Sequence, residues 1–278
     1  MGKARTKVHN VKTSQGNRRK PVKQNSQNGE PLRDAAAADV NHSVPSKPKD
    51  LSQKFDILFK HRVGGLLIAQ LNVQKIGKLK CKLLSKTLKD LRVDCLAIVE
   101  HHLPAGDYEP DQYSYRQNHP TMKINGFKHA SKHRDKASGG VAWFWRKDLN
   151  VETWEGAPLP NNLHEAGRER GWIKVQCKNS QIALGVAYLP TENSGDANND
   201  KYQQILDVLS LDCNLLEKDQ ITNFIFGDFN AHVGTPNEHP LGIKGNKPKL
   251  GYNGQRLLLW CQSLGKILVN SQPITEGL

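Results

Sequence analysis

The pattern that most constrains the fold is a series of short apolar runs that each end at a polar side chain. The runs IAQL, LAIV, LGVA and FIFG are followed by Asn72, Glu100, Tyr188 and Asp228. Continuous apolar runs of this length are typical of strands that are buried on both faces. Because loops converge beyond the strand ends of an α/β sheet, the polar residues there predict a ligand site.

Segments with helical periodicity lie between these runs. In residues 77–93 leucines recur at helical spacing, with lysines on the other side. Residues 199–216 and 253–265 predict two more helices, and Lys178–Ser180 predicts a hairpin turn. The order of elements predicts an α/β domain with mixed sheets covered by helices. The polar stretch Pro104–Ser138 is interpreted as a surface excursion and a candidate substrate loop.

The charge of the chain favours a polyanionic partner. Its 278 residues include 40 Lys and Arg against 27 Asp and Glu, a net charge of +13. Residues 1–50 hold eleven basic and four acidic residues, which leaves +7 in that segment. Nucleic acid or an anionic membrane surface fits this balance, and a solvated lysine-rich surface is the alternative.

The N-terminal part has the composition of a leader outside the folded domain. Residues 1–53 contain no aromatic side chain and few large apolar ones, so we predict a disordered basic leader before a domain at 54–278. The cluster NRRKPVK within it fits a nuclear import signal, a polyanion-binding arm or an ordinary flexible leader.

The cysteines and the hydropathy predict the compartment. The five cysteines form no CxxC pair and each lies in an apolar stretch, so we expect buried, reduced thiols. No apolar run approaches the roughly 18 residues of a membrane span, and no apolar segment follows the basic N-terminus as in a secretory signal. We therefore expect a nuclear or cytoplasmic protein that is neither secreted nor embedded in a membrane.

The polar residues at the strand ends suit the hydrolysis of a phosphodiester. This reaction uses a hard cation, a water and a base. Mg²⁺, with Mn²⁺ as the alternative, prefers oxygen ligands such as those of Glu100 and Asn72. Asp228 suits the base, Asn230 can orient it, and Tyr188 can donate to a phosphate oxygen.

Each of these residues also has a structural interpretation. Glu100 is then a solvated carboxylate, Asn72 and the Asp228–Asn230 segment are turn residues, and Tyr188 is a core phenol. A zinc site is not predicted at His101 and His102, because neighbouring strand residues point to opposite faces and no partner stands at ligand spacing. The ordered set of residues, more than any single member, carries the prediction.

The same residues resemble a known superfamily. FIFGDFNAHVG, LAIVEHHL, IAQLN and VAYLPTE are similar to motifs of the endonuclease/exonuclease/phosphatase superfamily, which has the fold of deoxyribonuclease I. GDFNAH is most similar to the apurinic/apyrimidinic-type endonuclease domain of non-LTR (LINE-type) retrotransposons. The resemblance covers residues 66–271 and implies a four-layer α/β/β/α sandwich of two packed mixed sheets flanked by helices. It implies Glu100 and Asn72 at the metal, and Asp228, Asn230 and Tyr188 around the scissile phosphate.

The resemblance also implies a function and one departure from the family. The implied function is that of a magnesium-dependent endonuclease domain that nicks DNA, which we expect to act as a monomer. The family pattern closes with an Asp-His pair on a late strand, and nothing after Ser271 supplies one. We therefore expect a sandwich that lacks its last strand or strands. Two alternatives are a catalytically silent fragment that at most binds nucleic acid, and a phosphatase of inositol lipids or sphingomyelin.

Overall fold

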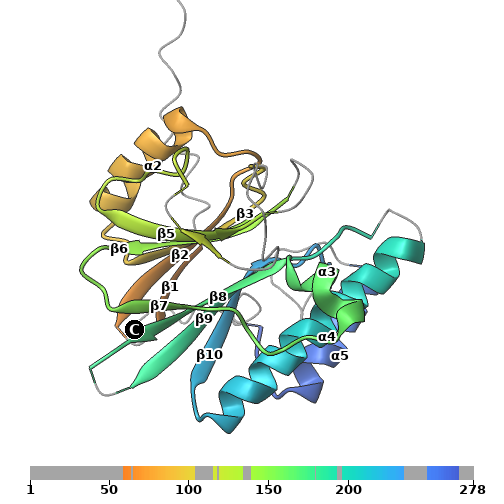
Figure 1. Ribbon diagram of the computed structural model, residues 1–278. Helices are drawn as coiled ribbons and strands as arrows, with labels where there is room; N and C mark the ends of the chain where they lie inside the picture. The colour runs from red at the N-terminus through yellow and green to blue at the C-terminus, as the bar shows by residue number, and fades with distance from the viewer. Residues whose placement is uncertain are drawn as a thin grey trace, which may run out of the picture. The chain divides into compact units, whose positions relative to one another are not determined.

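Two mixed β-sheets form the framework of the protein in the computed structural model (Figure 1). The described residues all belong to the unit Pro48–Leu278. They are residues 59–63, 65–103, 115–117, 119–133, 139–178, 180–192, 196–234 and 249–268. The predicted disordered leader, residues 1–53, lies outside them.

The first sheet has six strands in the order β1-β2-β3-β6-β5-β4. These strands are β1 (Phe59–Val63), β2 (Leu66–Asn72), β3 (Cys95–Val99), β4 (Arg116–Gln117), β5 (Phe127–Lys132) and β6 (Val141–Arg146). The β2–β3 pair is parallel and the other pairs are antiparallel. Helix α2 (Lys78–Asp90) connects β2 to β3, as a parallel pair requires a crossover.

The second sheet has four strands in the order β10-β9-β8-β7. They are β7 (Val151–Trp154), β8 (Arg170–Gln176), β9 (Gln181–Tyr188) and β10 (Thr222–Asp228). β8 and β9 form the predicted hairpin, and β9 pairs with β10 in parallel. The crossover between this parallel pair contains α4 (Asp196–Lys218), and α5 (Tyr252–Ser263) follows β10. A short 3₁₀ helix (Asn161–Leu163) and α3 (His164–Gly167) precede β8.

The two sheets pack face to face through apolar side chains, and helices cover the outer faces (Figure 1). Trp143 of the first sheet meets Phe226 of the second edge to face, with ring centroids 5.8 Å apart. Leu84 and Leu88 of α2 pack on the outer side of the first sheet. The apolar sides of α4 and α5 pack on the outer side of the second sheet. The layers are thus α/β/β/α, and the predicted fold class is confirmed.

Several side chains lie where the sequence did not predict them. Trp143, Phe144 and Trp145 are all buried, because β6 is covered on both faces. The stretch 104–138, interpreted as a surface excursion, contains the internal strand β5. Leu79, placed on the apolar side of its helix, is 79% exposed because it lies in the first turn. None of the described helices combines the length and the apolar character needed to cross a bilayer.

A buried ion pair fastens α4 to the second sheet. Asp212 of α4 and Arg170 of β8 are both almost fully buried, and Arg170 Nη2 donates to Asp212 Oδ1 at 3.1 Å. Trp172 Nε1 donates to the other carboxylate oxygen at 2.8 Å, and the backbone N–H of Ala157 donates to Oδ1 at 2.7 Å. Burial raises the pKa of Asp212, and the Arg170 charge opposes that rise. The carboxylate is thus stabilised by three donor residues from two segments, β8 and the loop after β7.

We expect Asp212→Asn to lower the free energy of unfolding by about 3–5 kcal/mol, because it leaves the Arg170 charge buried without its partner. Chemical denaturation of the purified chain measures this. The control is Asp207→Asn on the exposed side of the same helix, which should change stability by less than about 0.5 kcal/mol. Equal effects of the two substitutions would contradict the assigned role.

Candidate active site at one end of the two sheets

The five predicted site residues lie at the carboxyl ends of four strands. In the first sheet Asn72 is in register with Val99, the residue before Glu100. In the second sheet Asp228 is in register with Tyr188. Both of these strand pairs are parallel, so each pair brings its two polar residues to the same end of its sheet.

Two hydrogen bonds join these ends across the interface between the sheets. Asn72 Nδ2 donates to Asp228 Oδ2 at 3.1 Å, although the two residues are 156 positions apart. Two residues earlier on the same strand, Gln70 Nε2 donates to the backbone oxygen of Gly227 at 2.9 Å. The structure therefore brings Asn72 and Asp228 into direct contact, with Glu100 and Tyr188 on the adjacent strands.

Asp228 is held by the turn that follows it. Its second carboxylate oxygen, Oδ1, accepts the backbone N–H of Asn230 at 3.1 Å, which closes an Asx-turn. Asn230 has a positive φ of +45° and donates from Nδ2 to the backbone oxygen of Leu189 at 2.7 Å. The Leu189 N–H in turn donates to the backbone oxygen of Asp228 at 2.9 Å. Asn230 thus contacts the Asp228 carboxylate through its backbone N–H, and both residues are fixed to the end of β9.

Gly227 permits the close approach of β10 to β9. Its φ is +151°, a region open essentially to glycine alone. A Cβ atom there would come within 2.0 Å of the backbone oxygen of Ala187. The glycine before Asp228 is therefore required by the backbone of the neighbouring strand.

Glu100 lies in a strained turn. Its φ is +57° and that of His102 is +53°, conformations that are uncommon for residues with a Cβ and that cluster at active sites. The carboxylate side chain is 18% exposed, and its Oε2 lies 3.5 Å from His102 Nε2. The backbone oxygen of Glu100 accepts the N–H of Lys75 at 2.8 Å, which ties this turn to the loop after β2.

His101 is a structural residue beneath that turn. It is fully buried, donates from Nε2 to the backbone oxygen of Lys132 at 2.9 Å, and accepts the N–H of Leu103 at Nδ1. Burial, followed by the nearby His133, lowers its pKa to about 3, so the ring is neutral. A Cβ on Gly140 would collide with this ring. No three His, Cys, Asp or Glu residues among those described are grouped so as to hold a metal ion.

Asn253 is the residue at this site that the sequence did not reveal. It is 1% exposed, and its Nδ2 lies 3.1 Å from the Pro190 oxygen and 3.2 Å from the Asn230 oxygen, donating to both. Its own N–H donates to Glu192 Oε1 at 2.8 Å. One side chain at the start of α5 thereby fixes the loops that follow β9 and β10. The only trace of this in the sequence is an Asn-Gly pair at the predicted start of a helix.

Comparison with known proteins supports the fold. No protein-family model matches the sequence, and no functionally curated protein matches it significantly. Among solved structures, an apurinic/apyrimidinic endonuclease from Leishmania major is 14% identical, with a TM-score of 0.52 over 71% of this chain and 66% of that one. The catalytic domain of Xenopus laevis APE2 is 16% identical, with a TM-score of 0.49 over 69% of this chain and 67% of that one. The endonuclease domain of the telomere-specific non-LTR retrotransposon TRAS1 is 13% identical, with a TM-score of 0.43 over 71% and 70%.

The likeness to the Leishmania enzyme and the two packed mixed sheets establish the fold. The chain has the deoxyribonuclease I-like fold of the endonuclease/exonuclease/phosphatase superfamily, as the sequence motifs predicted.

We expect Gly227→Ala to lower the free energy of unfolding by at least about 2 kcal/mol, because the added Cβ would force β10 away from the Ala187 oxygen. Thermal or chemical unfolding measures the change. The matched control is Gly77→Ala at the start of α2, where φ is −156° and an added methyl group would have no other atom within 4 Å. A Gly227 variant as stable as this control would contradict the account of the strand end.

We expect Asn253→Ala to cost about 1–3 kcal/mol of stability, since two carbonyl groups in the loops after β9 and β10 lose their donor. Hydrogen exchange should also show faster opening of the amides at Leu189 and Asn230. Gln262→Ala, an exposed position on the same helix, is the control and should leave both measurements unchanged. Unchanged exchange at Leu189 and Asn230 in the Asn253 variant would refute the role.

Proposed function

We propose that this protein is a metal-dependent phosphodiester hydrolase whose domain nicks DNA. The observation that supports this most directly is the Asn72–Asp228 hydrogen bond, which joins polar strand ends of both sheets at one place. A carboxylate base, an orienting amide and a second carboxylate on the adjacent strand are the groups that a phosphodiester hydrolase needs.

The donors at the site fit a hard divalent cation. Glu100 offers a partly exposed carboxylate. Asn72 Nδ2 donates to Asp228, and Asn72 Oδ1 accepts the backbone N–H of Gln74 at 3.1 Å. Oδ1 keeps a second lone pair, which is available to a metal ion. We propose that Glu100 and Asn72 hold Mg²⁺, or Mn²⁺ in its place, because oxygen donors suit both ions. The bound ion would supply charge stabilisation for the phosphoryl oxygens.

Asp228 takes the role of general base in this proposal. Both carboxylate oxygens accept a hydrogen bond, one from Asn72 and one from Asn230, which fixes the plane of the group. Each oxygen keeps a lone pair, so the group can still take a proton from a water molecule. That water forms a bond to phosphorus as the bond from phosphorus to the 3′ oxygen breaks, and the 3′ oxygen takes a proton from solvent to become a 3′-hydroxyl. Tyr188, paired with Asp228 in register, would donate to a phosphate oxygen.

The remaining features of the proposal concern the partner, the setting and the origin. The net charge of +13 favours DNA, whose phosphates exchange bound counterions for lysines and arginines. Because all five site residues come from one chain, we propose that a monomer suffices. The five free cysteines suit a reducing compartment, the nucleus or the cytoplasm. The motif FIFGDFNAHVG supports an origin in a non-LTR retrotransposon.

We expect Mg²⁺-dependent nicking of supercoiled plasmid DNA by the full chain, and loss of it in EDTA. Asp228→Asn and Glu100→Gln should each reduce the rate by at least about 100-fold, because one removes the base and the other a metal ligand. The melting temperature of each variant should stay within a few degrees of the parent.

Asp207→Asn, an exposed carboxylate on α4, serves as the control and should nick like the parent. An Asp228 variant with parental activity would refute the assignment of the base. A parent chain that binds DNA in EDTA but never nicks it with Mg²⁺ or Mn²⁺ would instead establish the catalytically silent alternative.

A further inference from the structure

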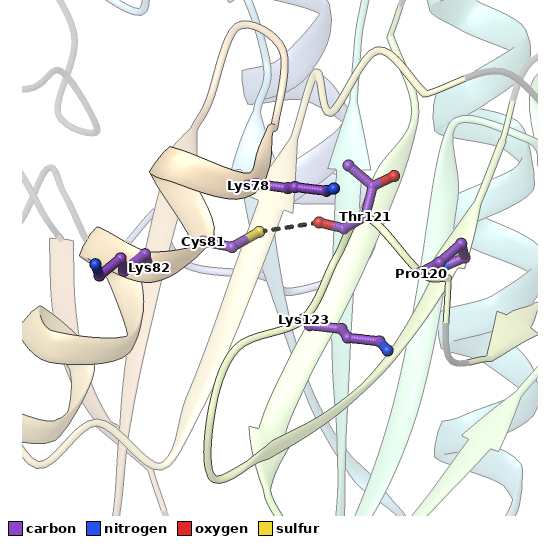
Figure 2. Close-up of a pocket in the computed structure, with 6 residues that line it drawn as sticks. All are labelled: Lys78, Cys81, Lys82, Pro120, Thr121 and Lys123. Carbon is purple, nitrogen blue, oxygen red and sulfur yellow. Dashed lines mark hydrogen bonds between the residues drawn. The ribbon is translucent and has the colours of Figure 1, made fainter.

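Two adjoining hollows lie between α2 and the segment that leads into β5. The first, with a volume of about 610 Å³, is lined by Lys78, Lys82 and Lys123 among others (Figure 2). Its Cys81 Sγ donates to the Thr121 oxygen at 3.3 Å (Figure 2). The second, of about 440 Å³, shares Lys123 with the first. No aspartate or glutamate is found among the described residues that line either hollow.

The second hollow is separate from the candidate active site. It is lined by Phe127 and Lys128 at the beginning of β5 and by Lys147 just after β6. β5 ends at Lys132, which is in register with Val141 of β6. Val141 is in turn in register with Val99, the last residue of β3 and the neighbour of Glu100. The lining residues His129 and Phe127 therefore lie three and five residues along β5 from the active-site end of the sheet, or about 10 and 16 Å at 3.3 Å per residue.

A buried imidazole in this hollow has a ring nitrogen without a partner. His129 of β5 is 5% exposed and stacks on Phe144, with ring centroids 5.1 Å apart. Its Nε2 is buried and makes no hydrogen bond in the described part of the chain. Burial, followed by the nearby His119 and His133, lowers the pKa of His129 to about 4. The ring is therefore neutral at pH 7 and carries one N–H. Nε2 has almost no accessible surface, so a ligand in the hollow reaches it only when the side chains that cover it move.

The other groups around this imidazole are donors or cations. Lys123, Lys128 and Lys147 are exposed at the hollow and contribute three positive charges. Ser85 Oγ accepts the backbone N–H of Asn125 at 2.9 Å, which leaves its hydroxyl hydrogen available to a ligand. Several donors require a ligand with several acceptor oxygens. A phosphoryl group has more acceptor oxygens than a carboxylate, which has only two, so it fits this set of donors better.

We propose that the hollow lined by Ser85, Lys123, Lys128, His129 and Lys147 is a binding site for a phosphoryl group. Ser85 donates from within the hollow, His129 donates when the side chains over its Nε2 move aside, and the lysines compensate the charge at the opening. The phosphoryl group comes either from a free nucleotide or from a nucleic-acid backbone. The site does not depend on the proposed hydrolysis, because it lies at the other end of the first sheet.

The test uses the full chain in EDTA, so that no metal occupies the candidate active site. Three anions are titrated: inorganic phosphate, 5′-AMP and a short oligonucleotide without terminal phosphates. The readouts are the ¹⁵N and ¹H resonances of the His129 ring and the binding isotherm. We expect saturable shifts of the His129 ring. Tighter binding of 5′-AMP identifies a nucleotide site, and tighter binding of the oligonucleotide identifies a backbone site.

Paired variants separate this site from general charge attraction. Lys128→Gln with Lys147→Gln should weaken binding of the preferred anion at least tenfold. The control is Lys174→Gln with Lys218→Gln, which removes the same total charge from β8 and α4. This pair should change the affinity for the preferred anion less than twofold. His129→Phe keeps an aromatic ring against Phe144 and should weaken binding by a comparable factor. If this variant does not fold, the lysine pairs still decide the question.

Two outcomes would overturn the proposal. One is the absence of any shift of the His129 ring with all three anions at millimolar concentration. The other is equal weakening by the two lysine pairs, which would assign the binding to net charge alone.

Discussion

The alignment of the two sheets at one end is the constraint on which the candidate active site depends. Gln70 and Asn72 reach across from β2 to β10, where they donate to Gly227 and Asp228. Apolar packing between the sheets, including the Trp143–Phe226 contact, holds the strands in this position. Because strand side chains alternate between faces, a shift of one residue along β2 would turn both amides away from the second sheet.

Backbone strain is concentrated at this same end. Of the seven non-glycine residues with positive φ among those described, five follow the ends of β2, β3 and β10. They are Gln74, Lys75, Glu100, His102 and Asn230. Such conformations are unfavourable by about 1–3 kcal/mol each and persist where the surroundings fix them. Here the buried ring of His101 and the buried amide of Asn253 supply that support.

The sequence predicted the strand ends well because their signal is local. Asn72, Glu100, Tyr188 and Asp228 each end a continuous apolar run, and all four occupy strand ends as expected. β5 was missed because Lys128, His129 and Lys132 give it a polar sequence, although His129 and Lys132 are buried. The role of Asn253 could not be predicted, since its partners Asn230 and Pro190 lie 23 and 63 positions away. Residues that act through distant partners leave no periodic pattern.

The central proposal is that Glu100 and Asn72 hold one divalent ion beside Asp228, the proposed base. Paramagnetic broadening by substoichiometric Mn²⁺ in the NMR spectrum of the full chain tests it most directly. The account predicts selective broadening of the side-chain amides of Asn72 and Asn230, with that of Asn125 on the α2 side unaffected, and loss of the effect in Glu100→Gln. Broadening that is uniform along the chain, or that leaves Asn72 unaffected, would contradict the claim.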